Sequence, residues 1–151
     1  MTAALNNRRA ILDESMDALA KCAEQLSFSL KKCVDISAPF TADNLESIEA
    51  LTSRFARTAD VLTHKAVKSL LLYLREDTMT FLDVANYLEK IRVANTFDDV
   101  IHIRELRNEI AHEYSNRDTA ELLDACLAFS PTLFDMMSRL VEYVHKLPPV
   151  A

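Results

Sequence analysis

Two residues in the second half of the chain have side chains suited to cleaving a phosphodiester. Arg107 carries a permanent charge on a planar fork of N–H donors, which matches a phosphate. His112, five residues later, exchanges a proton near neutral pH. Together they could cleave RNA without a metal ion. The histidine would deprotonate a 2′-hydroxyl or protonate the leaving 5′-oxygen, and the arginine would stabilise the charge that develops on the phosphate.

An arginine and a histidine on one helix more often have structural roles, but the surroundings of Arg107 favour a functional role. On an ideal helix Arg107 lies on the apolar side, with Ile103, Ile110 and Tyr114. No carboxylate lies three or four residues away from it. A half-buried arginine there needs a partner from elsewhere, which is either a distant acid or the anion of a ligand.

The spacing also raises a geometric problem. Five residues at 100° each put Arg107 and His112 about 140° apart around a helix. Convergence on one phosphate requires a distorted helix end, the reach of the arginine side chain, or a two-fold dimer that combines residues of both protomers. The third option predicts a homodimer. Asn108 and Glu109 lie four and three residues before His112, where each could orient its imidazole.

The elements that must position these residues are predicted to be helices. The 151 residues include no glycine, which excludes hairpins and phosphate-cradling loops that depend on it. We expect an all-α fold, an up-and-down bundle of about five helices in a single domain, residues 1–151. Apolar residues repeat every seven positions from Leu5 to Cys33, which predicts a helix over 3–34. This pattern is typical of a bundle helix and of an intermolecular coiled coil, and we favour the bundle.

Four more helices are expected along the chain. They should cover about 45–74, 80–93, 97 to 114–116, and 119–146. Capping boxes are predicted to start at Asp43 and Asp118, and Thr96 is predicted to cap the helix that carries the arginine and histidine. Ser130-Pro131 predicts either a kink in the last helix or a fresh helix start.

The second helix carries a basic stripe within an arc of about 100°. Two interpretations stay open: the stripe tracks an RNA backbone, or it is a solvated face paired with acidic neighbours. Its members are Arg54, Arg57, His64, Lys65, Lys68 and Arg75, of which Arg54, Arg57, Lys65 and Lys68 are the candidate RNA contacts.

Charge and cysteine content limit the partners. The net charge of −6 disfavours nonspecific binding to nucleic acid without excluding a local basic face. Cys22, Cys33 and Cys126 are widely spaced, and we expect them to be reduced and buried in a cytoplasmic protein. No apolar run predicts a signal peptide or a membrane span. His64 and His102 have no ligand-spaced partners, so both are interpreted as surface or structural residues and neither metal nor cofactor is expected.

The segment from Arg107 to Tyr114, with the sequence RNEIAHEY, resembles the R-x4-H-x-Y signature of the HEPN superfamily. A polar residue after the arginine is typical of that superfamily, and Asn108 fits. The nearest branch is HepT, the toxin encoded beside a minimal nucleotidyltransferase. The order of the helices along most of the chain also fits this superfamily. Only these eight residues are specific to it.

The resemblance implies a homodimeric bundle that acts as a metal-independent endoribonuclease toxin. Arg107 and His112 would be catalytic, with Asn108 and Glu109 in support. Tyr114 would be modified with AMP by the partner nucleotidyltransferase antitoxin, which silences the toxin. Two alternatives stay open. Some relatives are substrate-binding subunits of a nucleotidyltransferase complex without catalytic activity, and the chain could also be a plain helical interaction domain.

Overall fold

The computed structural model describes residues 3–77, 80–112 and 118–148, and 83% of them are helical, with no strand. The chain forms α1 (Ala3–Cys33), α2 (Ala42–Asp60), α4 (Phe81–Lys90), α5 (Phe97–Ala111) and α6 (Thr119–His145). A π-helical segment, η1 (Val61–Ala66), joins α2 directly to α3 (Val67–Tyr73). The predicted all-α bundle of about five helices is therefore confirmed, because α2, η1 and α3 form one continuous rod.

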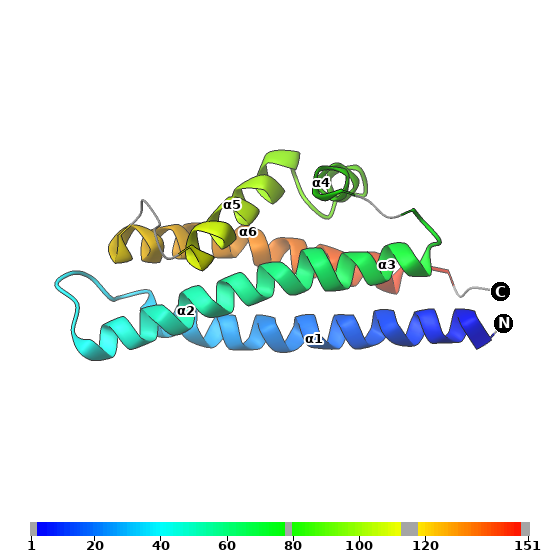
Figure 1. The fold of residues 1–151 in the computed structure, drawn as a ribbon. Coiled ribbons are helices and arrows are strands. Elements are labelled where there is room, and N and C mark those ends of the chain that lie inside the picture. Colours follow the sequence, from blue (N-terminus) through cyan, green and yellow to red (C-terminus); the bar gives the residue numbers. More distant parts are fainter. Residues whose placement is uncertain (1–2, 78–79, 113–117, 149–151) are drawn as a thin grey trace.

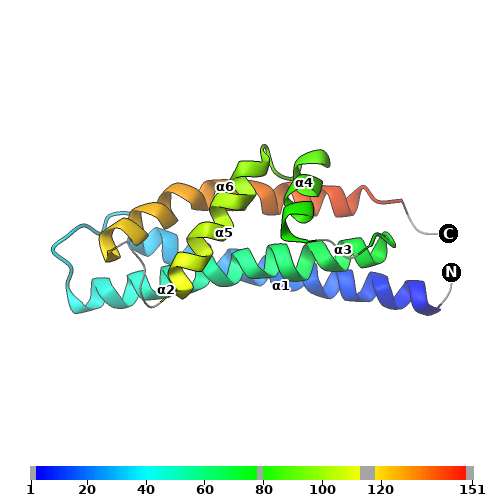
Figure 2. The same cartoon turned by 45° about the horizontal axis from the view of Figure 1, so that its top comes forward.

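Three long rods lie side by side, and two short helices cover them (Figure 1). The rod from α2 to α3 runs back along α1, and α6 packs against both α1 and α2. Seen from another direction, α5 crosses obliquely over the α2 rod while α4 lies over its α3 end (Figure 2). α5 contacts α2 and α6, so the helix with the arginine rests on the middle of the bundle.

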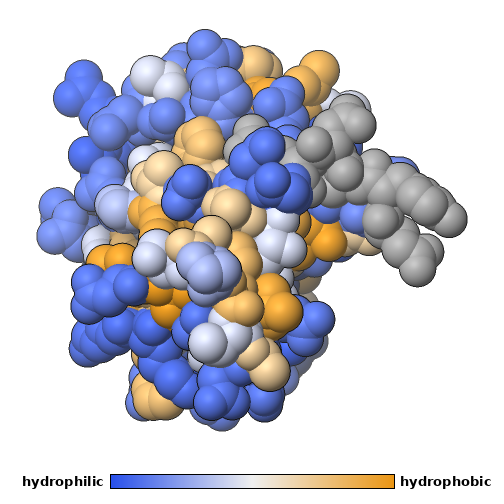
Figure 3. All heavy atoms as spheres, turned by 90° about the vertical axis from the view of Figure 1, so that its left-hand side faces the viewer, coloured by the Kyte–Doolittle hydropathy of each residue, from blue (hydrophilic) through white to orange (hydrophobic). Residues whose placement is uncertain are grey.

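The heptad seam of α1 is buried within this single chain. Leu12 and Leu26 have no exposed surface, and Leu19 is 1% exposed. A seam already filled by α2, α3 and α6 has no room for an intermolecular partner, so the bundle interpretation is confirmed. A buried hydrogen bond of 2.7 Å between Ser15 and Ser69 joins the hydroxyl groups of α1 and α3 across this interface. Apolar side chains also reach the surface among polar ones at the end of the bundle where α1 meets α2 (Figure 3).

Three predicted helix boundaries were wrong in detail. The N-cap of α2 is Thr41, not Asp43, because the Thr41 hydroxyl and the Asn44 amide oxygen accept each other's backbone N–H. α4 ends at Lys90, three residues early, since Arg92 leaves the helical region at a φ of 61°. The α5 helix ends at Ala111, and His112 is its extended C-cap.

Thr96 caps α5 as predicted, and Asp118 is the N-cap of α6, where the structure shows one half of the predicted capping box. Thr96 and Asp118 each accept a backbone N–H three residues later. Ser130-Pro131 does not start a new helix: α6 continues through Pro131, and the buried Ser130 hydroxyl donates back to the carbonyl of Cys126.

In the part of the chain that the structure describes, arginines occupy the two left-handed positions, at which other proteins favour glycine. Arg75 and Arg92 follow α3 and α4 with φ values of 58° and 61°. Around Arg92, the N–H of Val93 donates to Leu88 and that of Arg92 donates to Glu89, the paired bonds of a Schellman motif. The bonds satisfy the last carbonyls of α4, while the Cβ of Arg92 is held in a disfavoured region.

We predict that Arg92→Gly stabilises the protein by about 0.5–1 kcal/mol, because glycine removes the Cβ clash at positive φ. The measurement is urea unfolding followed by circular dichroism. The matched control is Lys21→Gly on the exposed face of α1, which should destabilise by about 0.5–1 kcal/mol. Equal destabilisation by both variants would contradict the prediction.

Candidate functional site

The middle of the second rod is locally underwound into a π-helical turn. The N–H of Val67 donates to the carbonyl of Leu62, five residues back. The hydroxyl of buried Thr63 donates to the carbonyl of Ala59 at 2.8 Å, which satisfies a carbonyl beside the distortion. Short π-helical turns are rare and occur frequently at functional sites. This turn starts directly after Asp60, the residue that meets Arg107.

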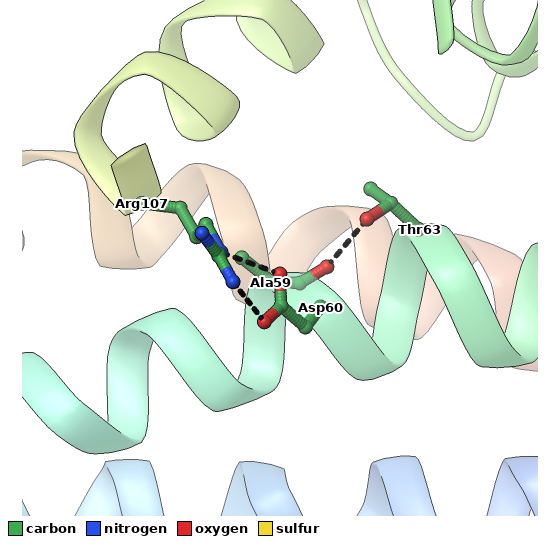
Figure 4. A network of polar contacts seen from close by, with 4 residues as sticks. All are labelled: Ala59, Asp60, Thr63 and Arg107. Atoms are coloured by element: carbon green, nitrogen blue, oxygen red, sulfur yellow. Dashed lines mark hydrogen bonds and ion pairs between the residues drawn. The ribbon is translucent and has the colours of Figure 1, made fainter. Parts of the chain in front are cut away.

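Arg107 reaches from α5 to Asp60 and forms a bidentate ion pair. Its Nε donates to Oδ1 of Asp60 at 2.7 Å, and its Nη2 donates to Oδ2 at 2.9 Å (Figure 4). Both side chains are about one-third exposed. The hydrogen bonds that Arg107 donates to Asp60 raise the pKa of Arg107 further, although burial opposes this, so Arg107 is charged at any physiological pH. The partner required for a half-buried Arg107 is therefore a distant acid.

A small pocket of about 170 Å³ opens between the second rod and α5 beside this pair. Arg104, Arg107 and Asn108 approach it from α5. His64 approaches it from the π-helical turn, next to Thr63. Phe81, the first residue of α4, closes a further side. Four of its nine lining residues therefore carry side-chain N–H donors, Asp60 is its acid, and Ala59, Phe81 and Ile103 are apolar.

His112 lies outside this pocket. It is exposed, and its backbone N–H donates to the carbonyls of Asn108 and Glu109 at 3.0 and 3.2 Å. α5 thus ends directly before His112, as the predicted distortion of the helix end requires. Even so, Arg107 lines the pocket and His112 does not. Of the two predicted supporting residues, Asn108 lines the pocket and Glu109 is half-buried. Tyr114 lies outside the described residues.

The members of the basic stripe differ in their surroundings, although three of the four candidate RNA contacts, Arg57, Lys65 and Lys68, are exposed. The guanidinium of Arg54 turns to α1, where Nη1 donates to Ser29 Oγ at 2.8 Å and the group lies 5.8 Å from the ring of Phe28. Arg57 and Lys65 also act on α1, because their charges partly offset the burial that raises the pKa of Cys22. His64 instead lines the pocket against α5. Lys68 is exposed.

The structure also bears on the cysteines, on metal-binding clusters and on membrane-spanning helices. Cys22, Cys33 and Cys126 are buried and are not joined in disulfides, as expected. Within residues 3–77, 80–112 and 118–148, no cluster of three His, Cys, Asp or Glu side chains could hold a metal ion. None of the helices in that part combines the length and apolarity needed to cross a membrane.

Sequence reasoning missed three residues of the pocket. Asp60 and Arg104 had no pattern to mark them, and His64 was interpreted as a surface or structural histidine. The one feature of the sequence that could have indicated a functional role for His64 is its position on the basic stripe. No protein-family model, curated protein or solved structure matches this chain in comparisons of sequence and fold.

We predict that the Asp60–Arg107 pair contributes about 1 kcal/mol of coupling to stability, because the geometry is bidentate while partial exposure weakens the attraction. The measurement is a double-mutant cycle of Asp60→Asn and Arg107→Gln in urea unfolding. The control is the same cycle on the Arg9–Asp13 pair of α1. This pair should give a smaller coupling, because it is joined by a single bond of 3.1 Å. Additive effects at the Asp60–Arg107 pair would contradict the prediction.

Proposed function

We propose that this chain is a HEPN-type, metal-independent endoribonuclease, the toxin of a toxin–antitoxin pair. The observation that carries the proposal is the position of Arg107. Its charged fork is held by Asp60 at the edge of a donor-lined pocket, while His112 is exposed at the end of the same helix. Asp60 occupies Nε and Nη2, so Nη1 of Arg107 is the part of the fork left to meet a phosphate.

In the proposed reaction, His112 takes the proton of the 2′-hydroxyl as this oxygen attacks the adjacent phosphorus. The bond from phosphorus to the 5′-oxygen breaks, and the leaving oxygen takes up a proton. The products are a 2′,3′-cyclic phosphate and a free 5′-hydroxyl. Arg107 stabilises the extra negative charge on the phosphate during the attack.

Because Arg107 and His112 do not share a pocket in one chain, the proposal includes a homodimer. A two-fold axis beside the end of α5 would set Arg107 of one protomer against the histidine of the other. The exposed position of His112 at the C-cap supports this arrangement, since its imidazole is accessible to another molecule.

One observation favours a second candidate function. The bidentate pair with Asp60 already satisfies Arg107 within the chain, as a purely structural arginine would be satisfied. A noncatalytic subunit that binds substrate for a nucleotidyltransferase needs no free arginine. The two candidates differ in whether the isolated protein cleaves RNA.

We predict that the purified protein cleaves RNA in the presence of EDTA, leaves 2′,3′-cyclic phosphate ends and does not cleave DNA, which lacks the nucleophile. His112→Ala and Arg107→Ala should each lower the rate by about a hundredfold or more. His145→Ala, at the exposed end of α6, is the matched control and should retain full activity. Absence of cleavage by the folded wild-type protein would favour the noncatalytic subunit.

We predict that the active site combines two protomers. Light scattering should give twice the chain mass of 17.1 kDa. Mixing Arg107→Ala with His112→Ala protein, followed by subunit exchange, should restore about a quarter of wild-type activity. Half of the randomly formed dimers are mixed, and each mixed dimer has one intact site of two. If both residues act within one chain, the mixture stays inactive.

We also propose that a partner nucleotidyltransferase attaches AMP to Tyr114. The added phosphate would bring negative charge to the motif and repel incoming RNA. Intact mass spectrometry after incubation with partner, ATP and magnesium should show a gain in units of AMP. The gain should be lost in Tyr114→Phe and kept in the control Tyr143→Phe. Inhibition by partner without any mass gain would mean that binding alone controls the nuclease.

A further inference from the structure

The pocket beside Arg107 has more hydrogen-bond donors than its own acid can satisfy. Asp60 uses both carboxylate oxygens on Arg107. Within the described part of the chain, neither Arg104 nor His64 has a hydrogen bond or ion pair to a protein acceptor, and both are exposed. The two arginines and one aspartate leave a net charge of +1 on the lining before any charge on His64 is counted.

Arg104 is held in place by an aromatic ring instead of an acid. Its guanidinium carbon lies 4.1 Å from the centre of the Phe81 ring. A guanidinium stacked on a ring keeps the N–H groups at its edge available in the plane of the group. Since Phe81 and Arg104 both line this pocket, the N–H donors of Arg104 are available to a ligand there. Stacking therefore orients Arg104 without neutralising its charge.

His64 enters the pocket from the most irregular part of the second rod. It belongs to the π-helical segment, where the i→i−5 bond from Val67 to Leu62 replaces the regular pattern. Maintaining such a turn inside a long helix has an energetic cost, and such turns recur at functional sites. The turn bears on the site because His64 lines the same pocket as Arg104 and Arg107 of α5.

We propose that this pocket is a phosphate subsite in which His64, Arg104 and Asn108 hold the RNA phosphate next to the scissile one. Arg107 borders both positions. The ligand class follows from the lining: N–H donors from three side chains, a net positive charge and a volume of about 170 Å³ suit a small anion such as a phosphate group. The proposal rests on the proposed nuclease function only for the statement that the phosphate belongs to RNA.

The first test uses inorganic phosphate and pyrophosphate as probes. Titration of the full chain, followed by NMR of the histidine ring and arginine Nε–H resonances, should shift His64 and Arg104. Arg104→Ala and His64→Gln should each weaken binding by about tenfold, the loss expected for one charge-assisted hydrogen bond. Lys21→Ala removes the same charge from a remote exposed site and should leave the affinity unchanged. No shift at the pocket, or an equal loss in Lys21→Ala, would overturn the subsite.

The second test uses an RNA oligonucleotide with 2′-O-methyl groups, which cannot be cleaved. Arg104→Ala should weaken its binding about tenfold, and Arg104→Lys should weaken it less, because lysine keeps the charge and loses the fork. The two proposals fail separately. Phosphate binding at the pocket without RNA cleavage supports the subsite and overturns the nuclease. Cleavage that is equally fast in wild type, Arg104→Ala and His64→Gln supports the nuclease and overturns the subsite.

Discussion

The ion pair between Asp60 and Arg107 fixes the direction of the Arg107 side chain, and the candidate site depends on that direction. It joins the end of α2 to α5 by two hydrogen bonds across 47 positions of sequence. Because both groups are charged and only one-third exposed, loss of either would leave the other half-buried without a partner. The direction of Arg107 at the pocket depends on this contact, while α5 is also held on the bundle by its buried residues Val100, Ile103 and Leu106.

The π-helical turn and the ion pair belong to one arrangement. Asp60 ends the regular helix, and Thr63 stabilises the distortion by bonding to Ala59. The turn then directs His64 to α5, while Arg54 and Lys65 on the same rod act on α1. Of the basic residues on this rod, His64 is the one that lines the candidate site within the described residues.

The separation of Arg107 from His112 gives the proposed function its main structural requirement. One faces a pocket on the chain's own second rod, and the other is exposed where α5 ends. A nuclease built from these residues needs a second protomer to complete the site, whereas a binding subunit does not. The oligomeric arrangement and the chemistry are thus linked: the mixed-protomer experiment bears on both at once.

The sequence by itself determined the all-helical fold, the buried seam of α1 and the caps at Thr96 and Asp118, because periodicity and capping are local properties of the chain. It also indicated that Arg107 needs a distant partner. Only the tertiary structure decided that this partner is Asp60 and that His64 and Arg104, not His112, share the pocket. These contacts join residues about 40 or more positions apart. They depend on how α5 crosses the second rod and on a π-helical turn, and no local pattern in a single sequence encodes either.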